Sequence, residues 1–563
     1  YDIKELWKKG ELGNVSGIGS NIAKHLDEYF KDPENSYLVK TVREIPETVF
    51  LFMNIPGVGP KKAFKLVKAF NLEDPKTAIE QLKQIALSGR IAELDTFGKK
   101  SEEEILASLE IYKNNQDKEK RMPYPIALKV ATDVIEYLKK HPDIKNIDVL
   151  GSMRRKKETI GDIDLAVIAE KDKCEGIIQY FIDYPKKLGV EGQGDKKASI
   201  IATNGMGIDL RVTSEDTYGA MLQYFTGSKE HNVKLREYAL KKGLSLNEYG
   251  IKKITHDELR IKKDKKVPVK NDITFKTEEK FYNYLGLDYI EPELRDGTDE
   301  IKLAEIKSLP NLVLEKDLKG DFHIHSNYPI EPSHDSGVNS TEEILNRALE
   351  LNYSYIGFSD HNPSMSTHSE EDILNILKRR YQSLKEIFQN KKYKPLDCYI
   401  GLEVDILPEG NLALPKDSEK YLDYIIVSIH SRFTQPIEET TQRILKALEF
   451  PKVKIFGHPT GRLIEKRDGV NAIWDVIFQK CVEKNIACEI NASPYRLDLP
   501  DLLVKQANKL GVKFTIDSDS HSLPEMDNLP YGISVARRGR LEKDAVITSW
   551  DKERLKNWIE EES

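Results

Sequence analysis

The spacing of hydrophobic and polar positions changes twice along the chain, and each change marks a predicted boundary. From Glu5 to about Tyr112, apolar residues recur as in short amphipathic helices interrupted by glycine. A polar segment at 113–121 leads into a region where strand-like and helical patterns mix. A second charged stretch, 291–318, precedes seven strand-like runs that alternate with helical stretches. The pattern predicts a multidomain α/β chain with a helical first part.

Composition agrees with several domains in series. The chain has 563 residues, 39% of them hydrophobic, which is too long for one core. No apolar run approaches the roughly 18 to 20 residues of a membrane span, and no basic-then-apolar leader opens the sequence, so we expect a cytoplasmic protein without a membrane partner. Because Tyr1 stands where Met is usual, we expect a truncated amino terminus. Four cysteines without CxxC spacing indicate reduced thiols: Cys174, Cys398, Cys481 and Cys488.

The net charge of -7 is unevenly distributed. Residues before about 300 are close to balanced, whereas the acidic excess lies beyond 300. Because local charge decides contact with a polyanion, the total does not exclude DNA binding.

Glycine-rich turns repeat in the helical part. The pairs Gly17 with Gly19 and Gly57 with Gly59 stand in strong G-x-G turns, and a weaker match covers residues 96–100. Such a turn can aim backbone N–H groups at a phosphate, and the helix after it adds its positive end. Lys61 and Lys62 lie beside the second turn. One such turn alone is better explained as a tight helical hairpin without a ligand, but the repetition favours sequence-independent binding to the DNA backbone.

Three aspartates indicate a two-metal site. Asp162 and Asp164 lie in one predicted strand and point to the same face, because side chains alternate along a strand. Asp209 lies in another strand-like run at 207–212, which could lie alongside. Three converging carboxylates are ligands suited to paired magnesium and in-line phosphoryl transfer. The D-x-D pattern alone would be a solvated strand edge, but Gly151-Ser152 and Arg155 upstream are suited to hold a triphosphate.

The sequence after Asp209 carries a specific resemblance. Tyr224-Phe225-Thr226-Gly227-Ser228, followed by Asn232 and Arg236, together with Gly151-Ser152-x-x-Arg155, Asp162-x-Asp164 and Asp209, resembles the family X DNA polymerases. The resemblance assigns Tyr224 and Phe225 to the deoxyribose and base, Asn232 to the minor-groove side of the incoming nucleotide and Arg236 to the template side. The implied nucleotide-binding residues are Gly151, Ser152, Arg155, Gly161, Tyr224, Phe225, Gly227, Ser228, Asn232 and Arg236.

The first hairpin departs from that family. Where the repair members place a Schiff-base lysine, six residues after the second glycine, this chain has His25. Lys24 is adjacent, but one residue along a helix turns a side chain by about 100°. We therefore expect no deoxyribose-phosphate lyase of that type.

The seven strand-like runs beyond residue 318 carry candidate metal ligands. They cover residues 321–325, 355–361, 399–403, 425–430, 453–458, 487–491 and 514–521. Alternation with helices predicts a βα barrel whose site lies at the carboxyl ends of its strands. A single terminal histidine is more often a hydrogen-bonded neutral residue. Repeated histidines and carboxylates instead suit two or three ions of zinc, manganese or iron.

These runs resemble the PHP (polymerase and histidinol phosphatase) domain. By that resemblance His323, His325, Glu403 and Asp519 hold one metal, Glu403 bridges to a second held by His430 and His458, and His361 and His521 hold a third. The loop after the first strand is longer than the family pattern, so Asp335, His334 and Glu331 are all candidates for completing the third site, with Asp335 first. Arg462 is a candidate phosphate clamp, with a salt bridge at the barrel rim as the equal alternative.

The resemblance predicts a fold class and a domain order. The fold is multidomain α/β, with a helix-hairpin-helix region, a nucleotidyltransferase palm and a distorted (βα)7-type PHP barrel. The predicted parts are a lyase-like subdomain (1–50), a duplex-binding subdomain (51–120), the palm (121–215), a nucleotide-selecting subdomain (216–300), a linker (301–317) and the PHP domain (318–563).

The leading hypothesis is a two-site repair enzyme. It is a DNA-directed DNA polymerase that fills gaps, with two Mg²⁺ or Mn²⁺, joined to a PHP-domain 3′-to-5′ exonuclease or end-processing activity, which includes abasic-site endonuclease. We expect gapped or primer-template DNA and dNTPs as partners, and a monomer. One alternative is a template-independent nucleotidyltransferase, which Asn232 and Arg236 argue against. The other is a DNA-end-binding scaffold with a structural metal barrel.

Overall fold

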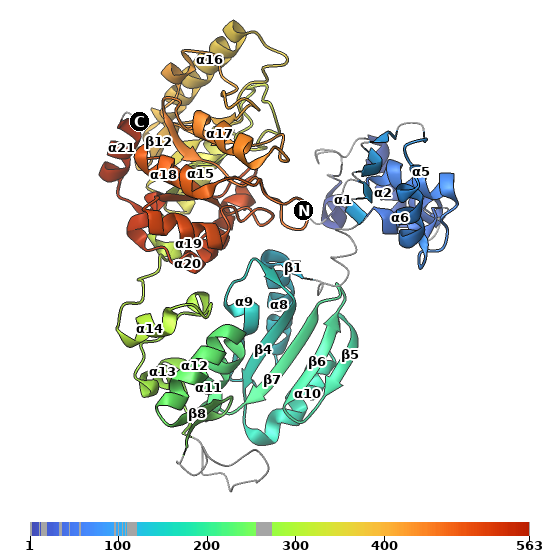
Figure 1. Cartoon of the computed structure of the whole chain (residues 1–563), viewed down its shortest axis with the longest axis vertical. Coiled ribbons are helices and arrows are strands. Elements are labelled where there is room, and N and C mark those ends of the chain that lie inside the picture. Colours follow the sequence, from blue (N-terminus) through green and yellow to red (C-terminus); the bar gives the residue numbers. More distant parts are fainter. Residues whose placement is uncertain are drawn as a thin grey trace. The chain divides into compact units, whose positions relative to one another are not determined.

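The structure is a computed structural model. It describes residues 3–10, 12, 20–32, 36–43, 45–53, 55, 58–94, 97–99, 101–103, 105, 106, 108, 109, 121–254 and 273–561. They fall into two compact units, residues 1–120 and 121–563, and each is described by itself (Figure 1). Within these ranges no helix is both long and apolar enough to cross a membrane.

The first unit is helical. Its helices are α1 (Ile3–Lys9), α2 (Ser20–Lys31), α3 (Tyr37–Arg43), α4 (Glu47–Phe52), α5 (Pro60–Phe70) and α6 (Ala78–Leu87). Phe52 of α4 and Leu66 of α5 are fully buried in one core, and Val58 between the two helices joins it. Gly59 is the residue before α5, and Pro60 occupies the first helical position, where its missing N–H costs nothing. The predicted turn residues Gly17, Gly19 and Gly57 lie outside the described residues.

The second unit begins with a five-stranded sheet, here called the aspartate sheet. Its order is β2 (Asn146–Val149), β4 (Asp162–Ile168), β7 (Gly207–Thr213), β6 (Lys197–Ala202) and β5 (Lys187–Gln193). Helices α8 (Tyr124–Leu138) and α10 (Cys174–Ile182) share one hydrophobic core with β4, β6 and β7. Ile163 and Leu165 belong to that core, so the residues that alternate with them on β4 point to the opposite face.

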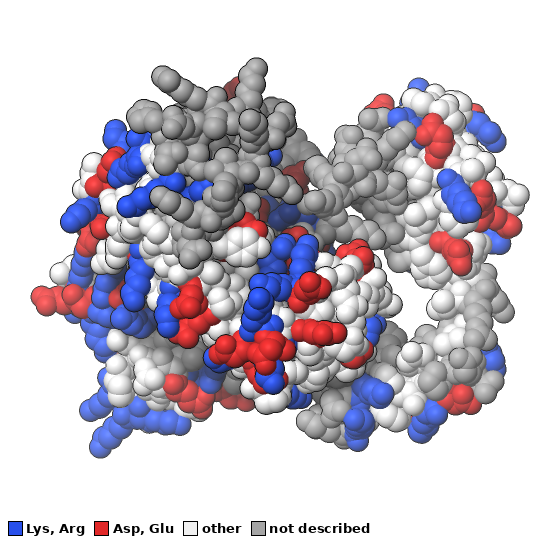
Figure 2. Space-filling view, turned by 90° about the horizontal axis from the view of Figure 1, so that it is seen from below, with Lys and Arg blue, Asp and Glu red and all other residues white. Residues whose placement is uncertain are grey.

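Several short elements surround this sheet. A small antiparallel pair, β1 (Met122–Pro123) with β3 (Thr159–Ile160), stands beside the one-turn helix α9 (Gly151–Arg154). Helices α11 (Tyr218–Thr226), α12 (Lys229–Lys241), α13 (Glu278–Leu285) and α14 (Glu300–Glu305) follow, with the hairpin β8 (Leu244–Asn247) and β9 (Gly250–Lys253). They are built on a separate core that contains Leu235, Phe281 and Tyr282. On the face drawn in Figure 2, basic and acidic side chains lie interspersed.

The rest of the unit is a ring of parallel strands, here called the strand ring. The strands are β10 (Gly320–Asp321), β11 (Tyr355–Phe358), β12 (Asp397–Ile400), β13 (Glu403–Asp405), β14 (Ile425–Ser428), β15 (Val453–Phe456), β16 (Ala487–Asn491) and β17 (Phe514–Asp517). They form parallel sheets β10–β12 and β13–β17. A parallel bridge between His361 and Glu403 joins the two sheets, and another between Ile324 and Ser520 closes the ring.

Helices alternate with the strands of the ring. They are α15 (Thr341–Glu350), α16 (Glu370–Phe388), α17 (Ile437–Ala447), α18 (Trp474–Glu483), α19 (Asp501–Leu510), α20 (Leu529–Arg538) and α21 (Lys552–Glu560). The apolar faces of α16 to α20 and strands of the ring share a large core that includes Phe456, Phe478 and Phe514, whereas α15 and α21 pack into two smaller clusters. Cys481 and Cys488 are free, buried thiols whose sulfur atoms lie 3.8 Å apart.

Candidate active sites

The predicted aspartates lie on the face of the aspartate sheet opposite α8 and α10. β4 and β7 are parallel neighbours, and their register pairs Asp164 with Asp209. Asp162 lies two residues before Asp164 on the same face, as strand alternation predicts. The structure therefore brings the three carboxylates from two adjacent strands to one surface.

The charge around these aspartates is balanced by basic side chains. Burial, reinforced by the nearby charge of Asp162, raises the pKa of Asp164 to about 6. Asp209 accepts a hydrogen bond from Ser199 at 2.5 Å and pairs with Lys197 at 2.9 Å and Arg211 at 3.3 Å. Because Lys197 and Arg211 stand where cations neutralise Asp209, metal ions would compete with them for its oxygens.

A tight turn places the predicted phosphate-binding residues beside Asp164. We call residues 151–158 the Gly151 turn. Gly151 has a φ of 57°, and a Cβ at this position would lie 2.7 Å from Oδ2 of Asp164, so only glycine fits here. Arg155 donates to the backbone carbonyl of Thr226 through Nη1. Burial and the neighbouring Arg295 lower the pKa of Arg155 to about 10.

The predicted base and sugar contacts lie at the junction of α11 and α12. The rings of Tyr224 and Phe225 are edge to face with centroids 5.0 Å apart, and Arg211 lies over the Phe225 ring at 4.0 Å. Asn232 donates to the carbonyl of Tyr224 at 2.7 Å, and Arg236 is exposed. Arg211 thus contacts both the aspartate site and the aromatic pair.

Gly227 and Ser228 form the bend between these helices. Gly227 has a φ of 68°, and a Cβ there would lie 3.0 Å from Nη1 of Arg155. Ser228 caps α12 by accepting a hydrogen bond from the backbone N–H of His231 at 3.2 Å. The bend therefore lies directly against Arg155, which the sequence predicts to bind the triphosphate.

The sequence reasoning missed a buried ionic network next to this site. Arg154 donates to Oγ1 of Thr226 at 2.6 Å and pairs with Glu278 at 2.8 Å. Arg295, whose side chain is fully buried, pairs with Glu278 at 2.5 Å. The network ties the Gly151 turn to α11 and α13. Its only sequence signal is Arg154, the first arginine of Arg154-Arg155.

In the strand ring, the predicted ligands converge on Glu403. Nitrogens of four histidines lie close to its carboxylate oxygens: His458 at 2.8 Å, His361 at 3.0 Å, His323 at 3.2 Å and His430 at 3.3 Å. His325 lies 3.3 Å from Asp519, and its ring centroid is 4.0 Å from that of His521. The carboxyl ends of different strands supply these residues, which is where ligands gather in such a fold.

The chemistry of this donor set fits metal ions. Ring nitrogens of His323, His325, His361, His458 and His521 and Oε2 of Glu403 are buried without a hydrogen-bond partner, which is unfavourable unless a cation binds them. Among the described residues, four groups have ligand atoms within 4.8 Å of one another: His323 with His325, Glu403 and Asp519; His325 with His361 and His521; His361 with Glu403 and His430; and His334 with Asp405 and His430. The three aspartates of the aspartate sheet do not form such a group.

The three candidate ligands for the third metal, all in the lengthened loop after the first strand of the ring, have different partners. Asp335 faces His361 at 3.7 Å and His521 at 3.5 Å. His334 instead pairs with Asp405 at 3.0 Å, and Glu331 pairs with His368 at 3.0 Å. The geometry therefore favours Asp335 for the third metal.

Two further carboxylates hold the predicted ligands and were not assigned from the sequence. Glu489 accepts from Nδ1 of His323 at 2.6 Å, and Asp405 accepts from Nδ1 of His430 at 2.7 Å. A carboxylate in this position fixes the tautomer of a ligating histidine. Glu489 stands in a strand-like run that ends in polar residues, which is the signal that could have identified it.

Arg462 is already bonded in this structure. Its guanidinium donates to the carbonyls of Arg496 and Leu497 and pairs with Glu158 at 2.8 Å. These contacts favour the salt bridge over the phosphate clamp.

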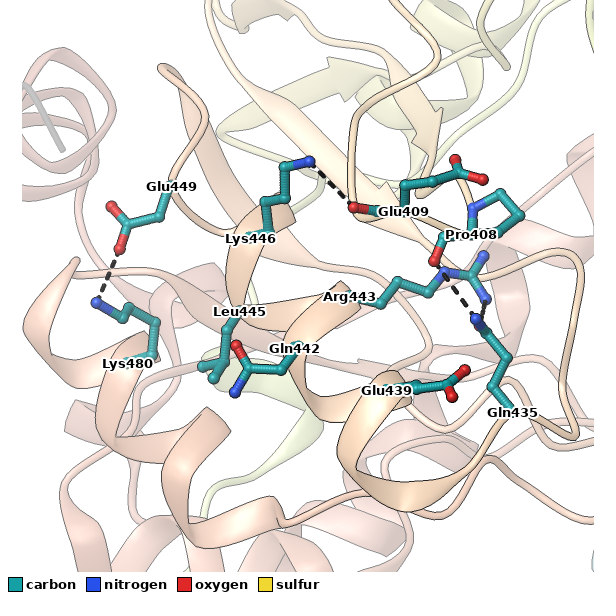
Figure 3. A pocket seen from close by; sticks show the side chains of 10 residues that line it. All are labelled: Pro408, Glu409, Gln435, Glu439, Gln442, Arg443, Leu445, Lys446, Glu449 and Lys480. Atoms are coloured by element: carbon teal, nitrogen blue, oxygen red, sulfur yellow. Dashed lines mark hydrogen bonds and ion pairs between the residues drawn. The ribbon is translucent and has the colours of Figure 1, made fainter.

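A cleft of about 670 Å³ on the ring's outer wall is a separate feature (Figure 3). Arg443 projects along it, but its guanidinium donates to the backbone of Leu407 and Ser431 and to the Gln435 side chain. Its lining residues differ from all predicted site residues, so the cleft is not the chemical centre.

Two family models match the chain. The DNA polymerase beta thumb matches residues 221–296, and the PHP domain matches residues 321–493. These matches cover the bend at Gly227 and Ser228, helix α12 with Asn232, and the strand ring up to β16.

Similar proteins agree with both matches. The DNA polymerase/3'-5' exonuclease PolX of Bacillus subtilis (strain 168) is 32% identical over 554 residues, which is 97% of this chain and 91% of that protein. Probable phosphatases of Clostridium novyi (strain NT) and Thermoanaerobacter sp. (strain X514) are 32% and 28% identical over 182 and 176 residues. Each match covers 30% of this chain, and 72% and 71% of those proteins. The chain therefore belongs to the family X DNA polymerases that carry a PHP domain.

Proposed function

We propose that this chain is a DNA-directed DNA polymerase whose strand ring is a metal-dependent 3′-to-5′ exonuclease. The register that places Asp164 beside Asp209, next to the Gly151 turn, carries the polymerase assignment. Similarity to PolX over nearly the whole chain supports both activities in one protein. Its substrates are primer-template or gapped DNA and dNTPs. Its role is to fill gaps in DNA repair. It acts as a monomer.

The subdomains follow from this assignment. The aspartate sheet is the palm, residues 216–300 select the nucleotide, and the strand ring is the distorted (βα)7 PHP barrel. The helical first unit provides the lyase-like and duplex-binding subdomains, with Lys61 and Lys62 in the first turn of α5 directed to the DNA backbone.

In polymerisation, the residues divide into holding and selecting groups. Asp162, Asp164 and Asp209 would hold two Mg²⁺ ions, which would supply charge neutralisation and lower the pKa of the primer hydroxyl. Ser152 and Arg155 bind the triphosphate through a hydroxyl and a planar guanidinium.

The aromatic pair and α12 select the nucleotide. Tyr224 and Phe225 place apolar faces against the sugar and base, which excludes a 2′-hydroxyl. Asn232 is bonded to the Tyr224 carbonyl in the free protein, so nucleotide binding requires it to exchange that partner. Arg236 is exposed and donates through Nε to the carbonyl of Asn232 at 3.1 Å, and we assign it to the template side.

In the strand ring, the proposed metals are two or three ions of zinc, manganese or iron, which supply Lewis acidity for phosphodiester hydrolysis. His323, His325, Glu403 and Asp519 hold the first, Glu403 with His430 and His458 the second, and His361, His521 and Asp335 the third. Glu489 and Asp405 keep the ligating rings oriented. The same centre is suited to 3′-phosphate and abasic-site ends, since both present a phosphate ester.

The deciding experiment compares two variants on a gapped primer-template, with and without dNTPs. We expect Asp162→Ala to abolish extension and keep digestion, and His323→Ala to do the reverse. Asp172→Ala and His368→Ala remove the same residue types outside the two centres and should keep both activities. Extension that survives Asp162→Ala would overturn the assignment of the palm.

A further inference from the structure

Three consecutive residues of the Gly151 turn, 156–158, contact side chains of the strand ring. Arg538 of α20 donates through Nη1 to the backbone carbonyl of Lys156. Lys157 pairs with Asp501, the first residue of α19, at 3.3 Å. Glu158 pairs with Arg462 at 2.8 Å. These contacts join residues separated by more than 300 positions in the sequence.

The turn is built so that these contacts reach the phosphate-binding residues. Lys156 has a φ of 50°, a left-handed conformation that is unfavourable for a residue with a Cβ and that its surroundings must hold. The backbone N–H of Lys157 donates to the carbonyl of Ser152 at 3.0 Å, and that of Lys156 to Met153 at 2.9 Å. A displacement at Lys156 or Lys157 is therefore passed directly to Ser152.

The ring's side of the contact is itself fixed in place. The Arg538 side chain is 3% exposed, and its Nε pairs with Asp501 at 2.8 Å. Burial alone would raise the pKa of Asp501, but Arg538 and Lys157 outweigh burial and lower the pKa to about 2. Arg462 is held by the carbonyls of Arg496 and Leu497. Rigid partners of this kind hold a strained turn better than mobile surface side chains do.

We propose that Arg538, Asp501 and Arg462 of the strand ring are positioning residues for nucleotide binding at the aspartate sheet. The proposal rests on the proposed function, in which Ser152 and Arg155 hold the triphosphate. The ring would then serve synthesis by holding the Gly151 turn in its binding conformation, in addition to its own hydrolytic chemistry.

Other contacts between the ring and the rest of this unit provide a matched control. Arg540 pairs with Asp299 at 2.5 Å and with Asp296 at 3.4 Å, both outside the Gly151 turn. Arg540→Ala removes an arginine of the same segment and a contact of the same interface. It should leave the dNTP KM within about twofold of wild type, because neither Asp296 nor Asp299 belongs to the Gly151 turn.

The test uses opposite charge changes at one contact. Lys157→Ala removes a positive charge and Asp501→Ala a negative one, in the full-length protein. If long-range electrostatics governed triphosphate binding, the two changes would move KM in opposite directions. If positioning governs it, both raise KM for dNTP, by about tenfold or about 1.4 kcal/mol, with kcat changed far less.

Single-nucleotide extension of a primer with a nuclease-resistant phosphorothioate end measures KM and kcat. Arg538→Ala should raise KM in the same way and Arg538→Lys should recover part of it, because lysine can still donate to the Lys156 carbonyl. Exonuclease rates and melting temperature report an intact ring in each variant. Lys157 is 42% exposed, so its variant is expected to fold even where one at buried Arg538 does not.

Arg155→Ala separates this inference from the proposed function. A raised KM in Arg155→Ala with an unchanged KM in Lys157→Ala and Asp501→Ala would overturn the positioning role alone. An unchanged KM in Arg155→Ala would overturn the triphosphate site and this inference with it. Opposite shifts in Lys157→Ala and Asp501→Ala would also overturn the positioning role.

Discussion

Gly151 provides the sharpest test of the polymerase geometry. Gly151→Ala introduces two separate penalties. The first is the left-handed backbone at φ 57°, which costs a residue with a Cβ about 1–2 kcal/mol. The second is the new Cβ, which would lie 2.7 Å from Oδ2 of Asp164, well inside van der Waals contact. The carboxylate, or the turn that carries Ser152, must therefore move.

The magnitude follows from that displacement. Relief of the contact requires a shift of roughly 1 Å, and a misplacement of that size can cost about a hundredfold in rate. We expect extension to fall by about that factor at saturating dNTP and Mg²⁺. Digestion by the strand ring should be unchanged, because Gly151 does not belong to its metal centre.

Gly205→Ala separates the two penalties. Gly205 lies between β6 and β7 with a φ of 84°, and a Cβ there meets nothing within 4 Å. It carries the backbone penalty without the contact, so we expect a similar loss of thermal stability but extension within a few-fold of wild type. Single-nucleotide extension and melting curves of both variants are the measurements. Equal extension rates in the two variants would refute the reasoning.

Three further predictions follow from the sites. The raised pKa of Asp164 means that stability falls as pH rises from its ordinary value of 3.8 to about 6, because the carboxyl ionises first in the unfolded chain; metal-free Asp164→Asn should therefore be more stable than wild type. At about 1.4 kcal/mol per pKa unit, the free energy of unfolding should rise by about 3 kcal/mol at pH 8 and by about 1 kcal/mol at pH 4.5. Denaturant unfolding in the presence of a chelator measures it at both pH values. An equal rise at both would contradict the prediction. Glu489→Gln should weaken metal activation of digestion by about 10- to 100-fold without changing extension, as metal titrations of both activities would show. Asp335→Ala should slow digestion more than His334→Ala does; the reverse order would exclude Asp335 from the third metal.

The local pattern of the sequence predicted much of the site because that chemistry is local. Strand alternation is enough to place Asp162 and Asp164 on one face, and the structure shows them there. Strand-like runs that end in histidine likewise led to the metal centre around Glu403. In both cases the alternation of side chains along a strand predicts which way a residue points.

Partners distant in sequence could not be predicted in this way. Arg154 meets Glu278 across 124 positions, and His323 meets Glu489 across 166. Neither pair has a periodic signal, because tertiary packing alone brings the elements together. The contact of Arg538 with Lys156 likewise joins residues that are far apart in the sequence. It changes the interpretation of the ring most, because it connects the ring to the turn that carries Ser152 and Arg155.

The two centres differ in how firmly they can hold metal. The ring offers imidazole and carboxylate ligands, among which Glu403 is 1% exposed and His323 is fully buried, and such a donor set favours ions bound with little water. The aspartate sheet offers only carboxylates, Asp162 is exposed, and Asp209 is already paired with Lys197 and Arg211. Mg²⁺ keeps much of its hydration and binds such sites together with substrate phosphates. We therefore expect the polymerase centre to take up its ions together with the nucleotide, and the ring to keep its ions between substrates.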